Sequence, residues 1–122
     1  MSYEITQRFF FEAAHTLSRK IEAEASRRVH GHTYYGEVSI AGEPDAHGMV
    51  MDLGRLRAIV ERIRGDLDHR MLNEVEGLGI PTLENLCAFL WKRFESEGCP
   101  PSRIVVRRDA MGDSCALTAK RP

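Results

Sequence analysis

The stretch HTYYGEVSIA, residues 32–41, is rich in aromatic and β-branched residues and runs into GEPDAHG, residues 42–48, a cluster of turn formers. This composition predicts a β-strand that ends in a loop. The earlier segment Tyr3–His15 is also predicted to be a strand, because most of its apolar residues share one parity. Residues 16–29 between the two are polar and aperiodic, so we expect a loop there and a hairpin-like return between the strands.

Two amphipathic helices are predicted after this hairpin. Asp52 is a good N-cap for the first helix, and Pro81-Thr82 opens the second. Apolar residues recur at helical spacing in both, at Leu53, Leu56, Ile59, Val60, Ile63 and Leu67 and then at Leu83, Leu86, Cys87, Leu90 and Phe94. This spacing gives each helix one face that can cover a sheet.

A second hairpin is predicted near the end of the sequence, from residues 104–106 and 115–119 around a short turn. The element order ββααββ predicts an α+β domain over residues 1–122, with a four-stranded antiparallel sheet and two helices on one face. The outer strands of such a sheet are left without partners, and edges of this kind are usually covered or joined to another subunit. We therefore expect a homo-oligomer formed through the sheet.

Composition argues against several classes of function. A chain of 122 residues suits one domain, and 17 basic against 18 acidic residues give a formal charge of −1. No basic excess predicts a nucleic-acid partner, and no apolar run approaches the roughly 18 residues of a membrane span. The three cysteines are odd in number and widely spaced, which does not suggest a disulfide framework, so we expect a cytoplasmic protein.

Three histidines form a candidate metal site. His30 and His32 are two residues apart, so on a strand both imidazoles lie on the same face. His15 ends the first predicted strand, and a hairpin could bring it alongside. Three imidazoles with an open fourth position are typical of catalytic Zn²⁺, although they also suit iron or nickel. The alternative is that these histidines are satisfied by ordinary hydrogen bonds.

Asp68 and His69, just after the first predicted helix, form a second candidate constellation. A carboxylate that orients an imidazole and stabilises its charged form is a recurrent general-base arrangement. Adjacent residues need not face one another, however, and a histidine can simply complement the dipole at a helix C-terminus. The residues alone favour this second interpretation.

Six motifs in order carry a resemblance over nearly the whole chain: FFFEAAHTL (9–17), VHGHTYYGEVSI (29–40), MDLGRLRAIV (51–60), LDHRMLN (67–73), PTLENLCAFLW (81–91) and VVRRD with the following cysteine (105–115). They resemble the 6-pyruvoyltetrahydropterin synthase family, and within it most of all the bacterial 6-carboxytetrahydropterin synthases of queuosine biosynthesis. The resemblance implies the tunnelling (T-fold) ββααββ fold, in which three subunits join their sheets and two trimers stack. A homotrimer or homohexamer is the expected assembly.

The resemblance also implies roles for individual residues. His15, His30 and His32 match the three zinc ligands of the family, and Asp68 and His69 match its catalytic relay pair. The implied activity is a zinc-dependent lyase reaction on 7,8-dihydroneopterin triphosphate, of the 6-carboxy-5,6,7,8-tetrahydropterin synthase type. Zinc would act there as a Lewis acid on the side chain of the pterin substrate.

Three further residues match the pterin-binding segments of the family. Thr82 and Glu84 match the helix start that lines the pterin pocket. Asp109 falls where the family carries the glutamate that anchors the amino-pyrimidine edge of the pterin, and it is shorter by one methylene. A carboxylate at that place makes a bidentate, charge-assisted contact with the ring.

The chain departs from the family at its catalytic cysteine. Carboxy-type members carry it four residues before H-G-H and pyruvoyl-type members six before, where this chain has Ser26 and Glu24. A serine hydroxyl is a much weaker proton acceptor than a thiol. Glu24 could replace the cysteine, as glutamate does in family members that cleave the neopterin side chain differently, here to 6-hydroxymethyl-dihydropterin. A non-catalytic pterin- or metal-binding homologue is the remaining alternative.

Overall fold

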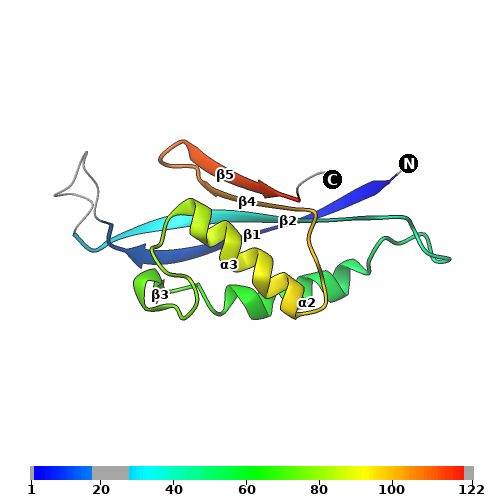
Figure 1. The fold of residues 1–122 in the computed structure, drawn as a ribbon, viewed down its shortest axis with the longest axis horizontal. Helices are drawn as coiled ribbons and strands as arrows, with labels where there is room; N and C mark the ends of the chain where they lie inside the picture. The colour runs from blue at the N-terminus through cyan, green and yellow to red at the C-terminus, as the bar shows by residue number, and fades with distance from the viewer. Residues whose placement is uncertain (1, 18–27, 120–122) are drawn as a thin grey trace.

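The computed structural model describes residues 2–17 and 28–119, drawn in Figure 1. Its largest feature is a pair of long strands, β1 (Tyr3–His15) and β2 (His30–Gly42), which pair antiparallel along their whole length. The register runs from Tyr3 opposite Gly42 to His15 opposite His30. The predicted hairpin-like pairing is confirmed. Its second strand starts two residues earlier than the sequence pattern predicted, so His30, Gly31 and His32 all belong to β2.

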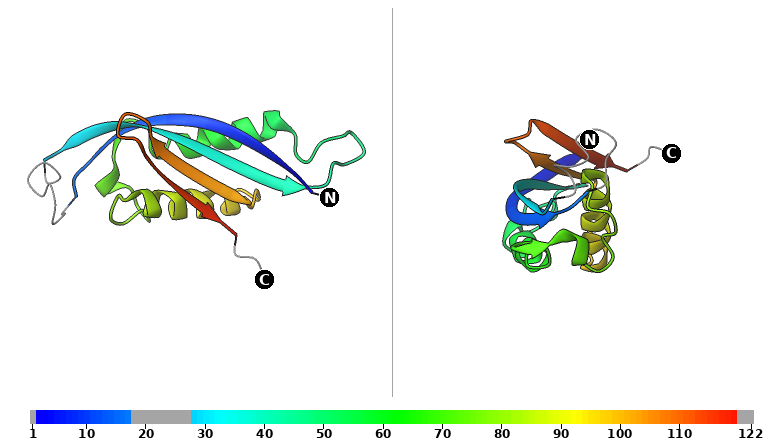
Figure 2. Two further views of the ribbon diagram at one scale, coloured as in Figure 1. Left: turned by 90° about the horizontal axis from the view of Figure 1, so that it is seen from above. Right: turned by 90° about the vertical axis from the view of Figure 1, so that its left-hand side faces the viewer.

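The helices and the remaining strands follow in the order α2 (Leu53–Arg64), β3 (Arg70–Met71), a 3-10 turn η1 (Leu72–Glu74), α3 (Leu83–Ser96), β4 (Arg103–Arg108) and β5 (Asp113–Thr118). The sheet has the order β3-β1-β2-β4-β5. Both helices lie against the same face of this sheet, as the views in Figures 1 and 2 agree. The α+β class with two helices on one face is confirmed.

The predicted number of strands was wrong, because the sheet has five strands and not four. The additional strand, β3, is two residues long and runs parallel to β1, pairing Arg70 with Ala13 and Met71 with Ala14. A two-residue strand is too short to leave a periodic pattern in the sequence. It forms where the chain leaves α2 and passes the end of β1, and the backbone N–H of His69 donates to the carbonyl of Glu12 there at 2.6 Å.

Both helices begin at the predicted capping residues. The Asp52 carboxylate accepts from the backbone N–H of Gly54 at 2.7 Å, and the Thr82 hydroxyl accepts from that of Asn85 at 3.1 Å. These contacts satisfy backbone donors that the first helical turn leaves without partners. No helix in the described part of the chain is long and apolar enough to cross a membrane.

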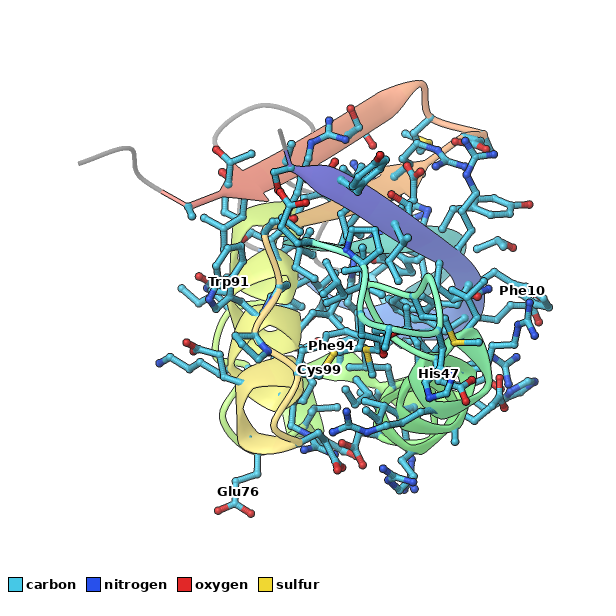
Figure 3. All side chains as sticks on the ribbon, turned by 90° about the vertical axis from the view of Figure 1, so that its right-hand side faces the viewer. Phe10, His47, Glu76, Trp91, Phe94 and Cys99 are labelled. Atoms are coloured by element: carbon cyan, nitrogen blue, oxygen red, sulfur yellow. The ribbon has the colours of Figure 1, made fainter. Side chains whose placement is uncertain are left out.

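The core lies between the helices and the inner face of the sheet. Figure 3 shows Phe94 and Cys99 inside this layer, whereas Glu76 projects away from it. Strand parity places odd-numbered residues of β1 and even-numbered residues of β2 on the inner face. Gly36 lies opposite Phe9, and a Cβ at Gly36 would come within 2.4 Å of the Phe9 ring. A glycine is therefore required where this ring crosses β2.

Candidate functional site

The imidazole rings of His15, His30 and His32 meet at the end of the β1–β2 pair. The ring centroid of His15 lies 4.4 Å from that of His30 and 5.0 Å from that of His32. The ring centroids of His30 and His32 are 5.0 Å apart. One nitrogen from each ring lies within 4.8 Å of the other two. The cluster follows from the register, because His15 pairs with His30 and both histidines of β2 share the inner face.

The second nitrogen of two of these rings is already engaged. The Nδ1 atom of His15 lies 2.7 Å from the hydroxyl of Tyr34, and the Nδ1 atom of His30 lies 2.7 Å from the carbonyl of Arg28. A carbonyl only accepts, so Nδ1 of His30 carries the proton and Nε2 keeps its lone pair. Burial raises the pKa of Tyr34 to about 12, so this partner of His15 stays a neutral hydroxyl.

This arrangement suits a bound metal. Metal-bound histidines commonly donate their other N–H to a carbonyl or another acceptor, which fixes the ring and its tautomer. His15 is 1% exposed, and the other two rings are half-buried. Three imidazoles leave a fourth tetrahedral position for a ligand, as in catalytic zinc sites. The residues present therefore fit a zinc ion in both donor type and orientation.

A cavity of about 170 Å³ adjoins the cluster. Its lining comes from β1, β2, the start of α3 and the end of β4: His15, Leu17, Tyr34, Pro81, Thr82, Leu83, Glu84 and Arg108. Thr82 and Glu84, the two residues expected to line a ligand pocket, thus lie beside the histidines. Their helix N-terminus and the Glu84 carboxylate offer both donors and an acceptor to a ligand.

Arg108 is the most buried charged side chain beside the cluster, with 7% of the residue exposed. Its Nε atom donates to Asp113 at 2.8 Å, and its Nη2 atom donates to the other carboxylate oxygen of Asp113. The remaining terminal nitrogen, Nη1, lies 3.3 Å from Nε2 of His32. The β4–β5 hairpin therefore holds a guanidinium against one of the three imidazoles.

Asp109 lies outside this cavity lining. It follows β4 in the turn, where its carboxylate accepts from Nε of Arg107 at 2.9 Å and is 53% exposed. The residue that the end of β4 contributes to the cavity is Arg108. A role of Asp109 in anchoring a ligand remains a prediction. Glu24 and Ser26 lie outside the described residues.

Asp68 and His69 contact each other directly, with Nδ1 of His69 2.9 Å from Asp68. His69 adopts a left-handed backbone conformation, with φ at 58°, which an L-residue adopts at a cost. The pKa of Asp68 is held below its ordinary value, first because the backbone N–H of Glu12 donates to its carboxylate and further because His69 and Arg64 are close. The carboxylate therefore stays ionised at neutral pH beside the ring of His69.

This pair lies across the sheet from the three histidines. Nε2 of His69 is 4.0 Å from the carboxylate of Glu12, and Glu12 alternates with Ala13 along β1. Adjacent residues of a strand point to opposite faces, so Glu12 faces away from the side that carries His15. His69 and His32 nevertheless both line one open cavity of about 550 Å³ at the ends of β1 and β2, so the pair lies near the cluster while its contact with Glu12 is on the opposite face of the sheet.

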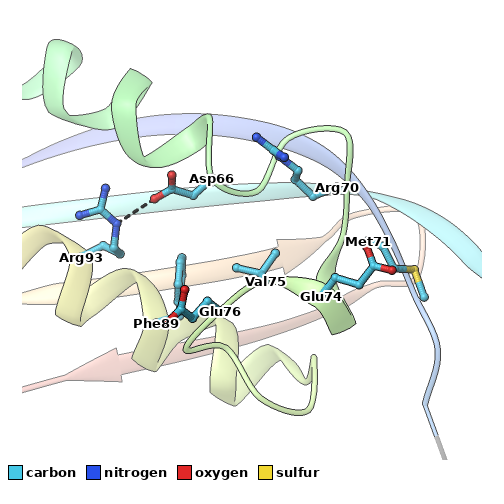
Figure 4. A pocket seen from close by; sticks show the side chains of 8 residues that line it. All are labelled: Asp66, Arg70, Met71, Glu74, Val75, Glu76, Phe89 and Arg93. Carbon is cyan, nitrogen blue, oxygen red and sulfur yellow. Dashed lines mark hydrogen bonds and ion pairs between the residues drawn. The ribbon is translucent and has the colours of Figure 1, made fainter.

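A larger cleft of about 470 Å³ lies between the end of α2, η1 and α3 (Figure 4). Its lining residues are Asp66, Arg70, Met71, Glu74, Val75, Glu76, Phe89 and Arg93. Arg93 donates to Asp66 at 2.8 Å across it. Charges of both signs alternate around this cleft, and none of the predicted site residues lines it. We assign it no ligand.

Two residues of the site, Tyr34 and Arg108, were not among the site residues predicted from the sequence. Tyr34 shares the parity of His30 and His32 on β2, and this signal was sufficient to place it beside them. Arg108 was harder to find, because the end of β4 decides whether residue 108 or 109 faces the cavity. A shift of one residue moves a side chain to the other face.

The fold and the site define a class: α+β proteins that carry a cluster of three histidines, suited to a metal ion, at the end of two long paired strands. Comparisons with known proteins identify the family. The sequence model of the 6-pyruvoyl tetrahydropterin synthase family matches residues 4–111. The chain therefore belongs to this family. The solved structure of 6-pyruvoyl tetrahydropterin synthase from Caenorhabditis elegans aligns with a TM-score of 0.81 at 22% identity, covering 98% of this chain and 97% of that one.

Relatives within the family carry different activities in their names. The 6-carboxy-5,6,7,8-tetrahydropterin synthase of Bacillus subtilis is 37% identical over 132 aligned positions, covering 98% of this chain and 88% of that protein. The dihydroneopterin monophosphate aldolase of Pyrococcus furiosus is 36% identical over 93 positions, covering 76% of this chain and 75% of that protein. Similarity at this level shows the family to which the chain belongs.

Proposed function

We propose that the protein is a zinc-dependent lyase of the 6-carboxytetrahydropterin synthase type, acting on 7,8-dihydroneopterin triphosphate. The observation that carries this proposal is the convergence of His15, His30 and His32 beside the cavity lined by Thr82 and Glu84. The similarity to the Bacillus subtilis synthase over nearly the whole chain supports the same activity. Action in the cytoplasm and in queuosine biosynthesis belongs to the same proposal.

The metal site and the cavity would bind different parts of the substrate. Zinc held by the three imidazoles would polarise the hydroxyl-bearing side chain of the pterin. Thr82 and the backbone N–H groups at the start of α3 can bind acceptors of the ring, and the Glu84 carboxylate can accept from its N–H and amino groups. These contacts would hold the side chain of the substrate over the histidines.

Proton transfer is assigned to His69. Asp68 orients the ring through Nδ1, so Nε2 can give or take a proton at the carbon skeleton of the substrate. Because His69 contacts Glu12 on the face of β1 opposite His15, we propose that a second copy supplies the pair that acts at a given metal cluster. A homotrimer or homohexamer joined through the β1 and β5 sides of the sheet would provide such copies.

A second candidate function follows from the missing cysteine. The chain has Glu24 and Ser26 where the family has its cysteine, and the Pyrococcus furiosus relative is named as an aldolase. A carboxylate with a raised pKa can act as a general base where a serine hydroxyl is too weak an acid. In this alternative Glu24 replaces the cysteine, and a different carbon–carbon bond of the neopterin side chain is cleaved.

Product identification separates these functions. Zinc-loaded protein is incubated with 7,8-dihydroneopterin triphosphate, and the products are identified by mass spectrometry. We expect 6-carboxytetrahydropterin and acetaldehyde. A product of 6-hydroxymethyl-dihydropterin would support the aldolase alternative, and binding without turnover would leave only a non-catalytic pterin-binding protein.

The role of Glu24 is tested by Glu24→Gln, with Glu22→Gln as the matched control because it removes the same charge two residues away. If Glu24 is the base, Glu24→Gln lowers the rate by about 10²–10⁴-fold, the usual contribution of general-base catalysis. The control should keep its rate. Equal rates in both variants would exclude Glu24 and return the question to Ser26.

A further inference from the structure

The contact between Arg108 and His32 bears on how tightly the site binds its metal. Nη1 of Arg108 lies 3.3 Å from Nε2 of His32. Arginine is always a donor, so a hydrogen bond here requires that Nε2 of His32 offers its lone pair. A neutral imidazole has only one such lone pair, because its other nitrogen carries the proton.

The same lone pair is what a metal ion needs. If the metal binds Nε2 of His32, it takes the lone pair that Arg108 uses. If it binds Nδ1, then Nε2 carries the proton and faces the N–H of Arg108 as donor against donor. In either case the hydrogen bond between Arg108 and His32 must break before His32 can become a ligand.

Arg108 is held in position by an ion pair and by burial. Its guanidinium donates hydrogen bonds to both carboxylate oxygens of Asp113, and its side chain is 9% exposed. The bidentate contact fixes the plane of the guanidinium and directs Nη1 at His32. The carboxylate of Asp113 also compensates the positive charge of Arg108. This compensation reduces the repulsion between the guanidinium and a cation bound at the three histidines.

We propose that Arg108, clamped by Asp113, is a positioning residue that competes with the metal for His32 and thereby lowers the metal affinity of the site. The inference rests on the metal centre of the proposed function and adds a property to it. His15 and His30 differ from His32 in this respect. Their Nδ1 atoms contact the Tyr34 hydroxyl and the Arg28 carbonyl, so these contacts leave Nε2 of each ring for the metal.

Metal affinity gives the test. Purified, chelator-treated protein is titrated with Zn²⁺ in competition with a chromophoric chelator. We expect Arg108→Met to bind Zn²⁺ about three- to tenfold more tightly than the unmodified protein, the range expected for removing one competing hydrogen bond. Arg107→Met is the matched control, because it removes the same charge next door from a residue that pairs with Glu37 and Asp109. Its affinity should stay within about twofold.

Equal or weaker zinc binding by a folded Arg108→Met variant would overturn this inference alone. Failure of the unmodified protein to bind Zn²⁺ would overturn the metal centre itself, so the two failures are distinct. A measurement on the unmodified protein covers the case in which the variant does not fold. Histidine ¹⁵N NMR of chelator-treated protein should show His32 protonated at Nδ1 and unprotonated at Nε2, and the opposite tautomer would overturn the inference.

Discussion

Two histidine regions of this molecule are built in opposite ways. The cluster of His15, His30 and His32 lies on regular strands on the inner face of the sheet, and its rings are buried or half-buried. His69 lies at a loop position with φ at 58°, and its side chain is 75% exposed. The first region is fixed by strand register, and the second by the hydrogen bonds of His69 to the Asp68 carboxylate and to the backbone carbonyl of Glu12.

The difference matches what each kind of chemistry requires. A metal site needs several donors held at fixed separations with little water between them, which paired strands supply. A proton-transfer group needs access to a substrate and a partner that sets its charge, which a strained loop residue beside a carboxylate supplies. Changes in the cluster should therefore affect metal binding, and changes in the Asp68–His69 pair should leave it intact.

The largest effect is expected for His15→Ala, which removes the most buried imidazole of the cluster. Loss of one of three ligands should weaken Zn²⁺ binding by more than about 100-fold, beyond the 10- to 100-fold typical of outer-shell changes. Chelator competition and metal analysis measure the change.

His47→Ala is the matched control, because His47 lies in the turn after β2 and takes no part in the cluster. It should bind one equivalent of zinc as the unmodified protein does. Full zinc content in His15→Ala would contradict the ligand set, and a loss in His47→Ala would show that the cluster is not the site.

The contrast between these regions also explains what the sequence could predict. The parity of residues 15, 30 and 32 was readable, because a strand has a period of two and the register followed from one hairpin. The same parity could have placed Tyr34. The two caps, Asp52 and Thr82, were readable because their side chains satisfy local backbone donors.

The remaining features depend on where elements end and on contacts that cross the sheet. The two-residue strand β3 arises from a contact with β1 and not from its own residues. Whether Arg108 or Asp109 faces the cavity depends on a single residue at the end of β4. The contact of Asp68 and His69 with Glu12 required three-dimensional information, since only the path of the chain after α2 determines it.

An intermediate effect is expected for Tyr34→Phe, which keeps the cluster but removes the hydroxyl at 2.7 Å from Nδ1 of His15. A buried imidazole nitrogen would lose its partner, and zinc affinity should fall about tenfold, as for other outer-shell contacts of metal-bound histidine. Tyr35→Phe removes a hydroxyl from the neighbouring residue, which lies over Arg107 on the other face of β2, and should change the affinity little. Equal affinities in the two variants would show that Tyr34 does not orient His15.

The smallest effect, and the one that isolates the second region, is expected for Asp68→Asn. Because the pKa of Asp68 is lowered in the folded protein, its ionised form stabilises the fold at neutral pH, and this contribution is lost as the pH falls through the lowered pKa. At pH 7 the variant should be less stable by about 1 kcal/mol or less, since solvent screens part of these contacts.

The stability difference between the unmodified protein and Asp68→Asn should depend on pH. Urea unfolding of both proteins should give midpoints that differ at pH 7, begin to approach each other below the ordinary pKa of aspartate, near 3.8, and converge once the pH has fallen through the lowered pKa of the folded protein, where the unmodified side chain also becomes neutral. A stability difference that grew as the pH fell would contradict the lowered pKa, and a change in zinc affinity would contradict the separation of the two regions.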